Sequence, residues 1–196
     1  MNIPKAGSKV EIDIKNSKFF AETIPADSEE EARSEIKRVR SQYPDATHVV
    51  WAYLIGPTAD VFGLSDDREP RGTAGRPVLE VLKGSGMTNV LVTVTRYFGG
   101  TKLGTGGLVK AYSGSASAAI EKTPVEEYAE RLAFTVTISY NQYEKIRQLL
   151  ESYQAIIENE KFTDTVLLSG YIKKEHADTI KKAIKDKTAG SADISL

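Results

Sequence analysis

Cysteine is absent from this sequence of 196 residues, and so are long apolar runs. Without cysteine the chain can form no disulfide, thiolate metal site or cysteine nucleophile. No stretch is long and apolar enough for a signal peptide or a membrane-spanning helix, so the sequence predicts a cytoplasmic protein with no membrane contact. Histidine is scarce as well, since His48 and His176 are the only two.

Acidic residues are missing from one long window. The whole chain is nearly neutral, with 26 Lys and Arg against 27 Asp and Glu. Residues 81–120 contain no acid, although they contain Lys83, Arg96, Lys102 and Lys110. Chance together with a buried apolar strand is the alternative explanation for this window. Any affinity for anions must therefore come from a local patch and not from the net charge.

The alternation of apolar segments and turn residues predicts two α+β domains. In the first, residues 1–124, we expect strands near 9–15, 18–24, 47–55 and 89–97, helices over 28–42, 76–83 and 108–121, and a polar loop over 56–75. Either Asp27 or Ser28 can cap the start of the first helix, and Ser28 with Glu31 three residues later matches a capping box. Pro124 and the acidic residues that follow it, up to residue 130, predict a linker.

The alternation of apolar segments and turn residues starts again after the linker. In the second domain, residues 130–196, we expect a strand over 132–139, a helix over 142–153, a hairpin of 155–161 and 164–172, a helix over 175–187 and a strand over 192–196. This order, βαββαβ, is that of the ferredoxin-like fold.

A glycine-rich segment between a predicted strand and a predicted helix is the strongest candidate binding site. Glycines let a ligand approach the backbone closely, and the free N–H groups of a helix N-terminus bind anions. The candidate anion-binding or RNA-binding residues are Arg96, Lys102, Gly104, Gly106, Gly107 and Lys110, joined by Arg76 in the preceding helix. The spacing matches neither the Walker loop nor the dinucleotide fingerprint, so no cofactor is predicted. The alternative is a tight connection in which the glycines serve only the turns.

A second, acidic segment precedes the helix that begins near Arg76. Asp66, Asp67 and Glu69 are three carboxylates within four residues, a set that can ligate Mg²⁺ or support acid–base chemistry. The segment also contains Arg68 and Arg71, and with Arg76 it is neutral overall. We favour a structured loop in which these carboxylates pair with these arginines, and we assign no metal site.

For the other candidate residues, a structural role is favoured over a catalytic or binding role. His48 stands at the head of an apolar strand, where a structural histidine is the usual finding. Tyr97, Phe98 and Tyr112 flank the basic segment, and burial in the core is a commoner fate for them than stacking on bases. No Gly-x-Ser-x-Gly sequence stands at a strand-to-helix turn, so no catalytic residue is assigned.

Together the acidic and glycine-rich segments resemble the YigZ/IMPACT family. The matching residues are Ser65-Asp66-Asp67, Glu69-Pro70, Gly72-Thr73-Ala74-Gly75, Pro77, Arg96-Tyr97, Gly99-Gly100 and the run from Leu103 to Tyr112. Asp45-Ala46 and His48 with Ala52 also fit the central strand of that family. One departure is Arg68, because glycine is usual in the family at this position. The departure counts against a mechanism that needs a purely acidic loop.

The resemblance implies a first domain with the fold of a ribosomal-protein domain 2, also found in domain IV of elongation factor G. It implies a second domain like domain V of that factor. Eukaryotic members of the family regulate translation under amino-acid starvation through a partner protein. Fold analogy supports a function only by association, so the function must be argued from the site.

Three functions are compatible with these observations. The first is a non-enzymatic, translation-linked regulator that binds RNA or the ribosome through the glycine-rich surface, and we favour it because no nucleophile with a base is apparent. The second is a hydrolase-like enzyme for a small phosphorylated or peptide substrate, with Asp66, Asp67 and Glu69 as its working groups. The third is a regulator that binds only a protein partner.

Overall fold

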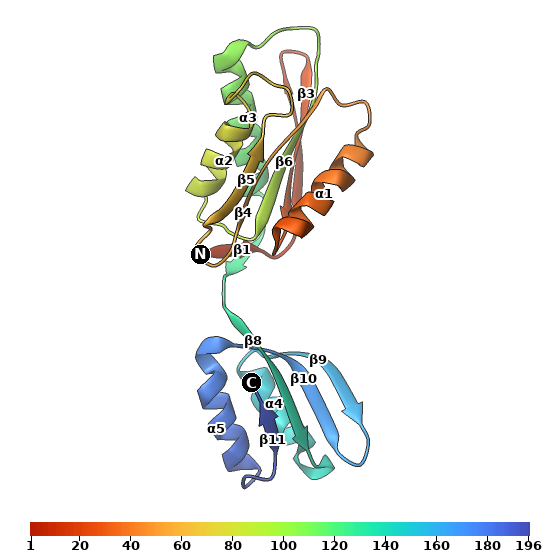
Figure 1. Ribbon diagram of the computed structural model, residues 1–196, viewed down its shortest axis with the longest axis vertical. Coiled ribbons are helices and arrows are strands. Elements are labelled where there is room, and N and C mark those ends of the chain that lie inside the picture. The colour runs from red at the N-terminus through yellow and green to blue at the C-terminus, as the bar shows by residue number, and fades with distance from the viewer. The chain divides into compact units, whose positions relative to one another are not determined.

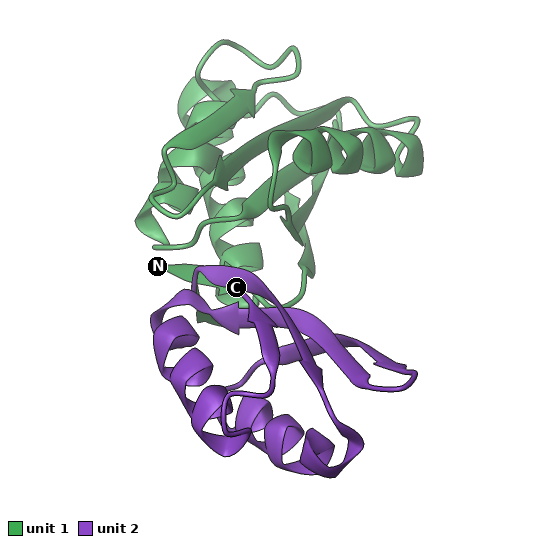
Figure 2. Cartoon of the chain, turned by 60° about the horizontal axis from the view of Figure 1, so that its bottom comes forward, with its two compact units in different colours: residues 1–128 green, residues 129–196 purple.

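The computed structural model describes all of residues 1–196 and divides the chain into two compact units. Unit 1 is Met1–Tyr128 and unit 2 is Ala129–Leu196 (Figure 2). Each unit has its own sheet and its own buried core. None of the helices combines the length and the apolar character needed to cross a membrane.

Unit 1 is built on a five-stranded sheet in which every neighbouring pair is antiparallel. Its strands, in spatial order, are β2 (Ser8–Ile14), β3 (Ser17–Pro25), β6 (Val90–Tyr97), β4 (His48–Ile55) and β5 (Val61–Ser65). β6 is the central strand and is buried along almost its whole length, as its unbroken apolar and β-branched sequence predicts.

Helices cover both faces of this sheet (Figure 1). α1 (Glu29–Gln42) packs on one face. Of the two predicted caps, Ser28 is the one that forms, because its hydroxyl accepts from the N–H of Glu31. α2 (Gly75–Gly84) and α3 (Gly104–Glu121) pack on the other face, over the larger core. Even-numbered residues of β6 point to α2 and α3, as Val92 and Val94 do, so Arg96 lies on that face as well.

Two expectations for unit 1 are wrong. The polar loop over 56–75 contains the edge strand β5, whose Val61 and Phe62 are exposed, so the strand lacks the buried alternation that identifies strands in a sequence. The third helix begins at Gly104, four residues before the predicted start at Leu108. Its first turn is rich in glycine, which has a poor intrinsic preference for helix, and tertiary packing overrides that preference.

The predicted linker is partly a strand. β1 (Asn2–Pro4) pairs antiparallel with β7 (Val125–Glu127), so the chain enters and leaves unit 1 through one two-stranded sheet. The N–H of Tyr128 also donates to the carbonyl of Met1 at 2.8 Å.

Unit 2 has the predicted order of elements. They are β8 (Arg131–Ile138), α4 (Tyr143–Ser152), β9 (Ile156–Phe162), β10 (Val166–Lys173), α5 (Ala177–Lys187) and β11 (Asp193–Ser195). The sheet order is β11-β8-β10-β9, and all pairs are antiparallel. Alternate residues of β8, such as Phe134 and Val136, are buried together with Ile146 of α4 and Ile180 of α5.

Candidate functional site

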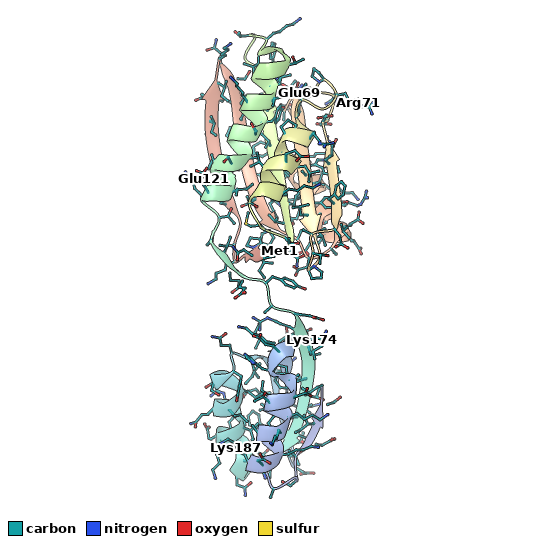
Figure 3. All side chains as sticks on the ribbon, turned by 90° about the vertical axis from the view of Figure 1, so that its left-hand side faces the viewer. Met1, Glu69, Arg71, Glu121, Lys174 and Lys187 are labelled. Carbon is teal, nitrogen blue, oxygen red and sulfur yellow. The ribbon has the colours of Figure 1, made fainter.

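The two segments singled out in the sequence meet at one cavity of unit 1. It has a volume of about 340 Å³, and its lining comes from the acidic loop, the end of β6 and the start of α3. Figure 3 shows Glu69 near the end of unit 1 at which α3 begins, while Glu121 marks the other end of that helix. The lining residues are Glu69, Pro70, Arg96, Phe98, Lys102, Leu103, Gly104, Thr105 and Leu108.

The N-terminus of α3, at the edge of this cavity, has no anionic partner within the protein. Leu103 occupies the cap position, no side chain caps the first turn, and that turn contains no acidic residue. The first N–H groups of a helix have no partner within the helix, and its dipole places partial positive charge there. The cavity therefore presents unused hydrogen-bond donors on its α3 side.

The other two helices of unit 1 begin differently. Ser28 caps α1, which has three glutamates in its first turn. At α2 the carboxylate of Asp66 accepts from the N–H groups of Gly72 at 2.8 Å, Ala74 at 3.1 Å and Gly75 at 2.8 Å. The anion at the start of α2 is thus the protein's own Asp66, which leaves α3 as the helix start that is open to a ligand.

A buried ion pair lies beside the cavity. Oε1 of Glu69 accepts from Nη1 of Arg96 at 2.6 Å and from the hydroxyl of Tyr112 at 2.7 Å. Glu69 and Arg96 are only 8% and 4% exposed. Oε2 of Glu69 makes no hydrogen bond, and Nε of Arg96 is buried without a partner. Arg96 is therefore not a free surface cation, because Glu69 compensates its charge, but both side chains retain an unused polar atom.

Tyr112 stays protonated in this cluster. Burial, and then the neighbouring Glu69 carboxylate, raise the pKa of the Tyr112 hydroxyl far above its usual value. The hydroxyl is therefore a hydrogen-bond donor to Glu69 and neither a base nor a nucleophile.

His48 links the cluster to the acidic loop. Its Nδ1 lies 2.7 Å from the carbonyl oxygen of Asp67, and its Nε2 lies 3.6 Å from Oε1 of Glu69. Because a carbonyl oxygen only accepts, Nδ1 carries a proton in this arrangement. The histidine holds the backbone of the loop in place, which agrees with the structural role that its sequence context favours.

Asp67 anchors the acidic loop to the rest of unit 1. Its carboxylate accepts from the N–H of Val49 at 2.6 Å and pairs with Arg40 at 2.9 Å. Burial works to raise the pKa of Asp67, but the Val49 hydrogen bond and the Arg40 charge outweigh it and lower the pKa below its usual value.

The predicted pairing of the three carboxylates with Arg68, Arg71 and Arg76 is wrong. Arg76 pairs with Glu80 on α2, and Arg68 donates to the carbonyl of Thr47. The true partners come from a distant strand, a distant helix and the backbone, which the local charge balance of a segment cannot indicate. No group of three or more His, Asp or Glu side chains is arranged to hold a metal ion.

Of the other predicted cationic binding residues, only Lys102 lines the cavity. Lys102 is exposed, lines the cavity and makes no ion pair. Lys110 is exposed further along α3, and Arg76 lies on α2; neither lines the cavity. A role of Lys110 or Arg76 in binding RNA thus stays a prediction that the cavity does not support.

The glycines of the segment serve different purposes. Gly104 has a φ of +72°, which favours glycine, and a side chain on Gly99 would overlap the backbone of Asn16. A side chain on Gly107 would press on Leu103. Gly106 is exposed in the first turn of α3, and a Cβ there would meet nothing within 4 Å. The fold itself does not require glycine at position 106.

Of the three aromatic residues flanking the segment, only Phe98 is open to a ligand. Tyr112 is fully buried, and Tyr97 packs against Phe20 and Tyr43 on the α1 face. Phe98 is 46% exposed at the cavity, with the Arg96 guanidinium 5.5 Å from its ring centre.

Two residues that shape the site carried no signal in the sequence. The hydroxyl of Thr47 accepts from the N–H of Phe98 at 3.0 Å, and the hydroxyl of Ser17 accepts from that of Gly99 at 3.2 Å. These bonds hold the start of the glycine-rich segment against β3 and β4.

Comparison with known protein families gives two matches along the chain. Residues 15–120 match the Impact N-terminal domain, and residues 136–191 match a domain of unknown function, DUF1949. The cavity and all its lining residues fall within the first match.

Individual relatives are similar over most of their length. An IMPACT family member from Haemophilus influenzae is 34% identical over 196 residues, covering 99% of this chain and 95% of that protein. The IMPACT family member YigZ from Escherichia coli is 38% identical, with 85% and 82% covered. YvyE from Bacillus subtilis is 33% identical, with 97% and 88% covered.

One solved structure is similar to both units. It is described as a hypothetical protein, is 34% identical, and matches with a TM-score of 0.71 over 98% of this chain and 95% of its own.

Proposed function

The chain belongs to the IMPACT family, and from that premise we propose that it is a translation-linked regulatory protein that binds RNA or the ribosome through phosphate groups. We further propose that unit 1 has the ribosomal domain 2 fold and unit 2 the ferredoxin-like fold, for which its element order and its β11-β8-β10-β9 sheet are the support. These folds occur in factors that work on RNA, which supports the proposal by analogy only.

One observation carries the proposal: the uncapped N-terminus of α3 opens on a cavity beside the unpaired Lys102. Backbone N–H groups at a helix start hydrogen-bond to anionic oxygens, and the helix dipole adds to that attraction. A phosphate group satisfies several of these donors at once. Lys102 contributes the one nearby positive charge that no carboxylate of the chain compensates.

The expected affinity for RNA is modest, because the patch is small. Lys102 is the one uncompensated cation at the cavity, so we expect about one phosphate contact, and the slope of log K against log salt is about −0.7 for a single strand. Phosphate contacts position a strand without reading bases, so we expect little sequence preference.

The test is filter binding of a single-stranded RNA across a salt series, with the wild-type chain and two variants. Lys102→Ala should weaken binding to all sequences and reduce the slope by about 0.7. Lys122→Ala is the matched control, since Lys122 is an exposed lysine at the opposite end of α3. Circular dichroism checks that all three proteins are folded.

Equal binding by the wild-type chain and Lys102→Ala at every salt concentration would remove this cavity as the RNA site. If no RNA binds at all, the regulator that recognises only a protein partner becomes the better function.

A further inference from the structure

We propose that the cavity takes a phosphomonoester, that is, a phosphate group bonded to one carbon only, such as a terminal phosphate. This proposal rests on the proposed function, because it assigns the kind of phosphate that the same site binds.

The lining of the cavity ranges from exposed to buried residues. Glu69 and Arg96, which line it, are less than a tenth exposed, while Lys102 and Thr105 stand at its exposed edge. A phosphate within a strand has a chain leaving on two sides and therefore stays at a surface. A terminal phosphate enters end-on, and a volume of about 340 Å³ is at the small end of ligand pockets.

Hydrogen-bond donors outnumber the unused acceptors at the cavity. The donors are the first N–H groups of α3 and the Lys102 ammonium. The unused acceptor is Oε2 of Glu69. A site that combines many donors with one carboxylate oxygen fits an anion that still carries one proton.

A phosphomonoester has such a proton and a phosphodiester does not. The second pKa of a phosphomonoester is about 6, so near that pH about half of the molecules keep one P–O–H group. That group can donate to Oε2 of Glu69, while the other oxygens accept from the start of α3 and from Lys102. A phosphodiester offers Glu69 only oxygen acceptors, and the two repel each other.

The uncompensated charge also agrees with a single phosphate. Arg96 offsets Glu69 at 2.6 Å, so the cavity has one spare positive charge, on Lys102, plus the partial charge of the helix. Phe98, half exposed at the same cavity, offers a flat apolar surface to the carbon-bearing part of the ligand.

The experiment measures binding of one ten-residue RNA with a 3′ fluorophore, carrying either a 5′-phosphate or a 5′-hydroxyl, to the full chain at pH 6. We expect the 5′-phosphorylated RNA to bind at least about fivefold more tightly. Lys102→Ala should abolish this preference and Lys122→Ala should keep it. Adenosine 5′-monophosphate and inorganic phosphate should compete with the phosphorylated RNA, and sulfate, which carries no proton at pH 6, should compete far less.

The outcomes separate the inference from the proposed function. Equal binding of the two RNAs, both weakened by Lys102→Ala, overturns the phosphomonoester and leaves RNA binding standing. Binding of the mononucleotide but of neither RNA supports the phosphomonoester and overturns RNA binding. Sulfate competing as well as phosphate overturns the role of Glu69 in the inference, and binding of none of the probes overturns both proposals.

Discussion

At the scale of single residues, the acidic loop contains two consecutive positions in left-handed backbone. Asp67 has a φ of +40° and Arg68 a φ of +70°. Aspartate tolerates this region better than most residues, and the hydrogen bond from Val49 holds the Asp67 side chain in place. Arg68 has neither advantage. Glycine adopts this conformation without strain, which agrees with the glycine that the family resemblance leads us to expect at this position.

Replacing Arg68 should therefore stabilise the chain, in spite of the lost side chain. We expect Arg68→Gly to raise the free energy of unfolding by about 0.5–1 kcal/mol, because relief of left-handed strain exceeds the added entropy of the unfolded chain. Arg68→Ala is the matched control, since it removes the same side chain but keeps the Cβ. Urea denaturation measures both, and a lower stability of the glycine variant than of the alanine variant would contradict this explanation.

The lowered pKa of Asp67 predicts how the stability of the chain depends on pH. Because its pKa is lowered in the folded chain, its contribution to stability is present above its unfolded pKa of about 3.9 and is lost as the pH falls through the lower folded value. We expect Asp67→Asn to cost about 1 kcal/mol at pH 7, since the exposed Arg40 partner limits the effect, and to cost less and less below pH 4.

Thermal unfolding of the two proteins between pH 7 and pH 3 checks this expectation. Asp45→Asn serves as the control, because Asp45 is exposed and makes no ion pair. A difference between the wild-type chain and Asp67→Asn that stays constant over this pH range would show that the Asp67 charge contributes nothing.

At the scale of elements, α3 contains two glycines that have open space around them and no left-handed φ, Gly106 in its first turn and Gly114 in its middle. Alanine is the better helix former by up to about 1 kcal/mol. We expect Gly106→Ala and Gly114→Ala both to raise the melting temperature, and only Gly106→Ala to weaken phosphate binding, because its methyl group stands beside the free N–H groups. Isothermal titration with adenosine 5′-monophosphate measures the second effect. Equal affinities of the two variants would mean that no ligand approaches this turn.

The sequence could predict elements whose pattern is local. β6, α1, α2 and the order of unit 2 follow from apolar runs, caps and periodicity, so they were predicted within a few residues. β5 could not be predicted, because an exposed edge strand leaves no burial pattern, and neither could the early start of α3 among its glycines. These elements are fixed by partners that are distant in the chain.

For the site too, local residue types could be predicted from the sequence, but partners distant in the chain could not. Residue types indicated that Glu69, Arg96 and Lys102 matter, and the structure brings all three to one cavity. Their partners could not be predicted: Arg96 stands 27 positions from Glu69, and Arg40 stands 27 positions from Asp67. A pairing of this kind depends on sheet register and on the path of a loop, which no local charge pattern contains.

At the scale of the whole molecule, each unit has a core of its own, and unit 1 also has a closing sheet of β1 and β7. We expect the fragment 1–128 to fold alone and to keep the phosphate affinity of the full chain. The fragment 1–124, which lacks β7, should be less stable by about 1–3 kcal/mol, because it loses a few backbone hydrogen bonds of roughly 0.5–1.5 kcal/mol each. Thermal unfolding of both fragments tests this, and equal melting temperatures would mean that the β1–β7 pairing contributes no stability.

The β1–β7 pairing also affects the order in which unit 1 folds during synthesis. During synthesis Pro4 leaves the ribosome long before Val125, its partner in the pairing. At about 5–20 residues per second, β1 waits on the order of 6–24 seconds for the strand that completes it. Through that interval the backbone groups of β1 that pair with β7 have no strand partner, while β2, β3, β4 and β6 can already pair with one another. Asn2 alone can bond earlier, to Gly86 and Thr88, once residue 88 has been made. β1 is thus made early in its unit but gains its full set of backbone hydrogen bonds only after β7 has been made.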